Sequence, residues 1–138
     1  MKIMIVDDSK IDLFLHERFI QLSGICDKVI SYNNAESALQ YINENSMMPS
    51  ELPAIVLLDI QMPEINGFEF LNRLQQFPES VRTAITIIMV SSTVDHTDIN
   101  RLEDYKNVKC LLKKPLDPDQ LKGVLEKINS NVKVGDVS

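Results

Sequence analysis

The chain has 138 residues, a formal net charge of −6, and 44% hydrophobic and 25% charged residues. These values fit one globular domain with its own hydrophobic core and exclude a fibrous or disordered chain. The negative charge argues against binding along a nucleic-acid backbone, and no stretch has the length and apolar character of a signal peptide or a membrane span. We therefore expect a cytoplasmic domain that binds neither nucleic acid nor membrane.

Short apolar segments alternate with amphipathic segments along the chain. Ser9 and Asn34 stand at positions typical of helix N-caps, and Gly24 stands where the first helix would end. In chain order, the predicted strands are 2–6, 28–32, 54–58, 83–90 and 108–112, and the predicted helices are 10–22, 35–45, 67–76, 95–105 and 118–128. This alternation predicts an α/β fold, a doubly wound five-stranded parallel sheet with five helices. Residues 1–130 would form this domain, and 131–138 a polar C-terminal tail.

The third predicted strand leads directly into a carboxylate. Residues 54–58 are all apolar, a pattern typical of a strand that is buried on both faces of a parallel sheet. Asp59 follows at once, and Met62-Pro63 breaks the regular structure soon afterwards. We therefore expect Asp59 at the carboxyl end of a central strand, which is the edge where open α/β sheets bind ligands.

Polar side chains also follow three other predicted strands. If the strands are parallel, one edge of the sheet carries Asp7, Asp8, Asp59, Ser91 and Lys114. Three carboxylates at one place repel one another, which raises the pKa of at least one of them unless a cation is bound. A ligand set made only of oxygens is typical of Mg²⁺. Asp7 and Asp8 alone would be read as acids that favour a helix N-terminus, so the metal site depends on the whole set.

The same set of residues predicts phosphoryl chemistry. With a metal ion and Lys114 beside it, Asp59 can stay ionised as a nucleophile while the two cations stabilise an incoming phosphoryl group. Ser91 adds a hydroxyl that can reach the same phosphoryl oxygens. The sequence therefore predicts phosphorylation of the Asp59 carboxylate.

Four segments together resemble the receiver domain of two-component response regulators. They are KIMIVDDS, IVLLDIQMPEINGFEFL, IIMVSS and LLKKPL, in this order and spacing within residues 1–130. The resemblance implies a flavodoxin-like fold with strand order 2-1-3-4-5. It further implies that Asp59 accepts a phosphoryl group from a histidine kinase or histidine phosphotransfer protein. Asp8, Asp59 and the backbone carbonyl of Gln61 would bind Mg²⁺, with Asp7 helping through water.

The resemblance also implies a switch, from which this chain departs. Ser91 resembles the switch hydroxyl, and Lys114 the lysine that meets the phosphoryl oxygens, followed by a cis bond to Pro115. The family commonly has Tyr or Phe on the fifth strand where this chain has Leu111. A leucine can pack inward or outward, but it cannot stack or hydrogen-bond as the ring does. Signalling would then depend more on the loop at 91–93 and on the helix after it.

The function predicted from the resemblance is that of a stand-alone response regulator, because the chain ends soon after its last predicted helix. Such a protein is not an enzyme beyond its own Mg²⁺-dependent phosphorylation and slow dephosphorylation, and it signals by binding a downstream protein. The alternative is a degenerate receiver that binds partners without phosphorylation. A phosphatase of the haloacid dehalogenase type would need a second acid where this chain has Gln61. The sequence specifies neither the cognate kinase nor the downstream target.

The first predicted helix carries more apolar residues than one buried face can hold. Leu13 and Ile20 lie nearly opposite the larger apolar arc. That arc contains Ile11, Phe14, Leu15, Phe19 and Leu22. Either the flanking helices bury both sets, or part of this helix stays exposed beside the acidic site as a docking patch for a kinase or phosphotransfer protein.

Overall fold

The computed structural model describes the backbone of residues 1–137 and the side chains of residues 1–130. Its strands are β1 (Lys2–Val6), β2 (Lys28–Tyr32), β3 (Ile55–Asp59), β4 (Thr86–Ser91) and β5 (Val108–Lys113). All neighbouring strands are parallel, and their order in the sheet is β2-β1-β3-β4-β5. The predicted flavodoxin-like topology is therefore confirmed.

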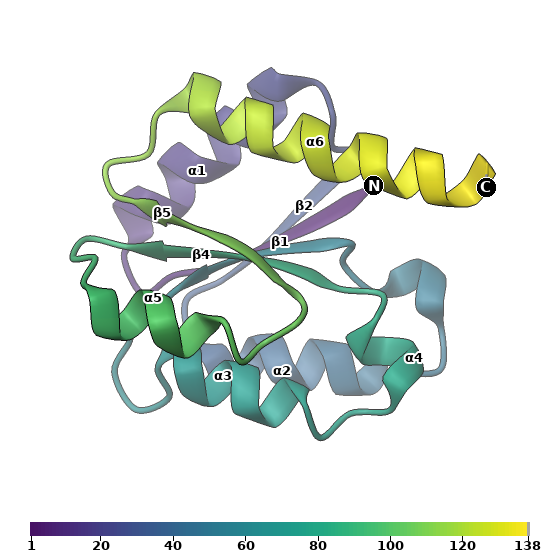
Figure 1. The fold of residues 1–138 in the computed structure, drawn as a ribbon, viewed down its shortest axis with the longest axis horizontal. Helices are drawn as coiled ribbons and strands as arrows, with labels where there is room; N and C mark the ends of the chain where they lie inside the picture. Colours follow the sequence, from purple (N-terminus) through teal and green to yellow (C-terminus); the bar gives the residue numbers. More distant parts are fainter. Residues whose placement is uncertain (138) are drawn as a thin grey trace.

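Helices cover both faces of the sheet (Figure 1). One face is covered by α1 (Lys10–Ser23) and α6 (Pro118–Val137), and the other by α2 (Ala35–Glu44), α3 (Gly67–Leu74) and α5 (His96–Leu102). A short helix α4 (Glu79–Arg82) and a 3₁₀ turn (Pro49–Glu51) lie in connections that precede β4 and β3. Within residues 1–137, no helix combines the length and the apolar character needed to cross a bilayer.

The central strand β3 divides its side chains between two hydrophobic cores. Val56 and Leu58 pack in the core under α2 and α3, and Ile55 and Leu57 pack in the core under α1 and α6. All residues of β3, including Asp59, are buried. The segment is apolar throughout because both faces of the strand are covered, as the sequence predicted.

Local signals set the ends of the first two helices as predicted. The side-chain oxygen of Ser9 accepts a hydrogen bond from the backbone N–H of Asp12, and that of Asn34 accepts one from Ser37. Gly24 ends α1 with a left-handed φ of 74°, a conformation that a residue without a Cβ adopts at no steric cost. The chain is thereby turned back toward β2.

The last helix is longer than its apolar pattern indicates. The prediction ended it at Ile128, the last residue of that pattern, but the backbone stays helical to Val137. The hydrophobic period marks only the part of a helix that packs on a core, so it could not locate the end. The predicted polar tail at 131–138 concerns side chains that are not described, and Ser138 lies outside the described residues.

Gly67, which has no Cβ, lets α3 approach the end of β3 closely. A Cβ at this position would lie 2.8 Å from the carbonyl oxygen of Asp59 and 2.9 Å from the Cα of Ile60. We expect Gly67→Ala to lower the free energy of unfolding by about 1–3 kcal/mol, because backbone atoms would have to move apart. Urea denaturation measures this change.

Gly123 supplies the matched control, since a Cβ there meets no atom within 4 Å. Gly123→Ala should raise the free energy of unfolding by about 0.5–1 kcal/mol through helix propensity alone. Equal effects of the two substitutions would contradict the close approach at Gly67.

Candidate functional site

The carboxyl ends of the strands meet at one edge of the sheet, where the arrowheads of β4 and β5 point in Figure 1. Asp7 directly follows β1, Asp59 ends β3, Ser91 ends β4 and Lys114 directly follows β5. Parallel pairing aligns these ends, since Asp59 is in register with Val90 and the backbone N–H of Lys114 donates to the carbonyl of Ser91. The fold thus brings together residues that are far apart in the sequence.

Three carboxylates form an acidic cluster, which consists of Asp7, Asp8 and Asp59. Each offers an oxygen atom, and these oxygens all lie within 4.8 Å of one another. Asp7 and Asp59 are buried, whereas Asp8 is exposed. Oxygen donors at this spacing, open to solvent on one side, fit a hard divalent cation that keeps some of its water.

The surroundings of Asp59 disfavour the ionised form of its carboxyl group. Burial, followed by the negative charges of Asp7 and Asp8, raises the pKa of Asp59 to about 7. Lys114 and a 3.3 Å hydrogen bond from the backbone N–H of Gln61 act in the opposite direction, but they do not compensate fully. The mutual repulsion expected from the sequence is therefore present, and it falls on Asp59.

Lys114 is shared among several acids. Its Nζ lies 2.8 Å from a carboxylate oxygen of Asp7, 2.9 Å from one of Asp12 and 3.5 Å from one of Asp59. Burial disfavours the charged ammonium, but the hydrogen bonds with Asp12 and Asp7 outweigh it and raise the pKa of Lys114. Sequence reasoning missed Asp12 at this site. The contact joins residues 102 positions apart, and only the topology of the sheet brings them together.

Ser91 takes part in a hydrogen-bond network with two loop residues. Its hydroxyl donates to Oε1 of Gln61 at 2.9 Å and also contacts the carbonyl oxygen of Thr93. The backbone N–H of Thr93 donates to the Ser91 hydroxyl at 3.1 Å, and the Gln61 amide donates to the Thr93 hydroxyl at 3.0 Å. The side chain of Gln61 therefore bridges the loops that follow β3 and β4.

The predicted switch position on β5 is half-buried. Leu111 packs against the core under α2, α3 and α5, and it borders a hollow of about 210 Å³ together with Ile99 and Leu102 of α5. Lys114 and Pro115 are joined by the cis peptide bond that was predicted. An aliphatic side chain thus packs at the position where the family commonly has an aromatic ring.

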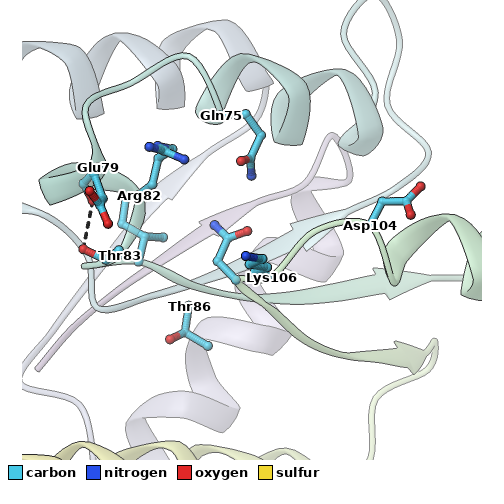
Figure 2. Close-up of a pocket in the computed structure, with 9 residues that line it drawn as sticks. Gln75, Glu79, Arg82, Thr83, Thr86, Asp104 and Lys106 are labelled. Atoms are coloured by element: carbon cyan, nitrogen blue, oxygen red, sulfur yellow. Dashed lines mark hydrogen bonds between the residues drawn. The ribbon is translucent and has the colours of Figure 1, made fainter.

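Two cavities differ in their relation to the acidic cluster. One of about 520 Å³ lies between α4, the start of β4 and the segment before β5, and Figure 2 shows Gln75, Arg82 and Lys106 around it. It belongs to the opposite edge of the sheet and shares no residue with the cluster. A second, of about 580 Å³, is lined by residues that include Asp8 and Gln61. Only the second cavity adjoins the candidate site.

The apolar arc of α1 is largely exposed, and its N-terminal part lies beside the site. Ile11, Phe14 and Leu22 are 73%, 70% and 69% exposed, and Leu15 is 41% exposed. The helix turns Ile20 into the core instead. Of the two alternatives left open by the sequence, burial of both apolar sets is therefore wrong.

An open parallel sheet in this strand order, with an acidic cluster, a hydroxyl and a lysine at its carboxyl edge, defines the CheY-like class of receiver domains. The family model described as the response regulator receiver domain matches residues 3–126, and the chain belongs to this family. It is thus a receiver of two-component signalling, a kind of domain that interacts with histidine kinases and downstream proteins.

Several known proteins are similar over nearly the whole chain. Response regulator Rcp1 from Synechocystis is 25% identical over 130 residues, which are 93% of this chain and 86% of Rcp1. The crystal structure of a response regulator receiver protein from Dyadobacter fermentans is 39% identical, with a TM-score of 0.78, and the match covers 93% of this chain and 97% of that one. A two-component response regulator from Cytophaga hutchinsonii is 25% identical, with a TM-score of 0.84 and coverage of 94% and 96%.

The raised pKa of Asp59 predicts how stability depends on pH. The folded protein binds a proton at Asp59 up to about pH 7, whereas the ordinary value for the unfolded chain is 3.8. Stability contributed by this proton is therefore lost as the pH rises from about 4 to 7. Without divalent cations, Asp59→Asn should raise the free energy of unfolding by about 2–4 kcal/mol at about pH 8 and change it little near pH 4.

Urea denaturation at both pH values measures the difference. The exposed Glu126→Gln in α6 is the control for the loss of one negative charge, and we expect it to change the free energy of unfolding by less than about 0.5 kcal/mol. A gain for Asp59→Asn that is the same at both pH values would contradict the electrostatic account.

Proposed function

We propose that this protein is a single-domain response regulator that accepts a phosphoryl group from a phosphohistidine donor onto Asp59, with Mg²⁺, and signals by protein–protein interaction. The observation that carries the proposal is the position of Asp59, which lies buried within the acidic cluster with the ammonium of Lys114 3.5 Å away. The match with Rcp1 spans 86% of that protein. The cytoplasmic location stays a prediction from the sequence.

The chemistry of the donor set supports a magnesium ion at the acidic cluster. Asp7, Asp8 and Asp59 would hold it together with the backbone carbonyl of Gln61. When bound, Mg²⁺ supplies positive charge that offsets the repulsion among the carboxylates and stabilises phosphoryl oxygens. Rcp1 has been crystallised in a Mn²⁺-bound form, so a protein of the same fold holds a divalent cation.

The proposed reaction is a displacement at phosphorus. A carboxylate oxygen of Asp59 attacks the phosphorus atom of the phosphohistidine, the N–P bond breaks, and the imidazole nitrogen leaves with the electron pair. The product is an acyl phosphate on Asp59. Lys114 can pair with the phosphoryl oxygens, and Ser91 can donate its hydroxyl to them once it leaves Gln61 and Thr93. No turnover is proposed beyond slow hydrolysis of this acyl phosphate.

We infer that the donor docks on the exposed apolar arc of α1. The N-terminal part of this arc lies next to the acidic cluster because α1 starts directly after Ser9, two residues beyond Asp7. Exposed Phe14 and Leu15 offer apolar area that a pair of helices could cover. The docking surface would then place a phosphohistidine near Asp59.

Acetyl phosphate tests the proposed acceptor directly. With Mg²⁺, the intact mass of the wild-type protein should increase by one phosphoryl group, and the mass of Asp59→Asn should not change, because the amide is not a nucleophile for this reaction. Omission of Mg²⁺ should slow the labelling by at least about tenfold. An unlabelled wild type would instead favour a binding module that works without phosphorylation, and equal labelling of both proteins would refute Asp59 as the acceptor.

If the donor docks on α1, substitutions in the exposed arc should slow phosphotransfer from protein donors and leave labelling by small phosphodonors unchanged. The double substitution Phe14→Ser and Leu15→Ser should slow phosphotransfer from phosphorylated histidine phosphotransfer proteins of the same organism by about tenfold, as expected when interface anchors are removed. Labelling by acetyl phosphate should stay unchanged. Met47→Ser is the control, since Met47 is 90% exposed in the loop before β3. Unchanged transfer by the double variant would contradict docking on α1.

A further inference from the structure

Asp12 contacts Lys114 at the carboxyl edge of the sheet, although it belongs neither to the acidic cluster nor to the predicted switch. It lies in the first turn of α1, and its side chain is 29% exposed. Its carboxylate oxygen accepts a 2.9 Å hydrogen bond from Nζ of Lys114. Although burial acts in the opposite direction, this hydrogen bond lowers the pKa of Asp12 below its ordinary value. Asp12 is thus an additional negative charge at the lysine.

The distances around Lys114 show which acids hold it. Its ammonium is within hydrogen-bond range of Asp7 and Asp12, at 2.8 Å and 2.9 Å, whereas Asp59 lies at 3.5 Å. Because an ammonium is a compact charge on a flexible stem, its position follows its strongest partners. Asp12 contacts Lys114 from α1, whereas Asp59 lies at the end of β3. The two carboxylates therefore compete for the same ammonium.

We propose that Asp12 is a positioning residue that restrains Lys114 and so slows the loading of Asp59 with phosphate. The proposal rests on the proposed function of Asp59. To pair with a phosphoryl group on Asp59, Lys114 has to weaken a charge-assisted hydrogen bond with Asp12, and bonds of this kind are about twice as strong as neutral ones.

The first test compares rates of labelling by acetyl phosphate with Mg²⁺, followed by intact mass. Asp12→Asn should label about three- to tenfold faster than the wild type, as expected from the loss of one charge-assisted hydrogen bond. Asp12→Glu keeps the charge and can still reach Lys114, so it should label at the wild-type rate within about twofold. Slower or unchanged labelling of Asp12→Asn would overturn the proposal.

A matched variant separates the contact with Lys114 from a general effect of charge. Asp98 of α5 lies beside the cavity that includes Asp8, and it has no ion pair with Lys114 within the described residues. Asp98→Asn should therefore change the labelling rate by less than about twofold. Equal acceleration by Asp98→Asn and Asp12→Asn would show a general charge effect and overturn the proposal.

A double-mutant cycle completes the test. In a Lys114→Gln background, Asp12→Asn should no longer accelerate labelling, because the restrained ammonium is gone. Without Mg²⁺ and phosphodonor, Asp12→Asn should lower the urea midpoint of the wild type but not that of Lys114→Gln. Additive effects in both measurements would contradict the proposal. Absence of labelling in every variant, the wild type included, would refute the proposed function itself, which is a separate result.

Discussion

The burial of Asp59 beside two further carboxylates is the constraint on which the rest of the site depends. A carboxylate at the end of a fully apolar strand loses its hydration, and the neighbouring Asp7 adds repulsion, so the pKa of Asp59 rises to about 7. Lys114 reduces this cost from one side, at 3.5 Å. The remaining imbalance favours additional positive charge, and this is the physical reason to propose a magnesium ion at the acidic cluster.

Much of the fold and of the site could be predicted because it depends on local patterns. The apolar run before Asp59 reflects the two helical layers that cover β3, and Ser9 and Asn34 cap their helices through contacts three residues away. Once the strands are parallel, their carboxyl ends must share an edge, which is why Lys114 could be placed beside Asp59. These predictions needed only periodicity and the geometry of a parallel sheet.

The remaining features depend on contacts that the sequence does not encode locally. Asp12 reaches Lys114 across 102 residues, and nothing in the first turn of a helix distinguishes such an acid from one that merely favours the helix N-terminus. The two apolar sets of α1 could not be ranked either, because α1 packs beside α6 and only the packed structure shows that Ile20 is the buried member. The short helix α4 buries only Val81, too little for a periodic signal.

Two features bear on how phosphorylation of Asp59 would change the structure elsewhere: Leu111 on β5 and the hydrogen bonds of Gln61. Strand β5 carries no ring, and the Ser91 hydroxyl at the end of β4 is hydrogen-bonded to Gln61 and Thr93 in the loops after β3 and β4. A phosphoryl group on Asp59 would compete with these loop groups for the hydroxyl. The loop at 91–93 is therefore the element through which α5 would respond in the proposed function.

A crystal structure with Mg²⁺ and beryllofluoride, a mimic of the phosphoryl group, tests the central claim most directly. The proposed function predicts beryllium bonded to a carboxylate oxygen of Asp59, a metal ion held by the acidic cluster, and fluorine atoms paired with Lys114 and the Ser91 hydroxyl. Beryllofluoride at another residue, or an acidic cluster that holds no metal at saturating Mg²⁺, would contradict the assignment of Asp59 as the phosphoacceptor.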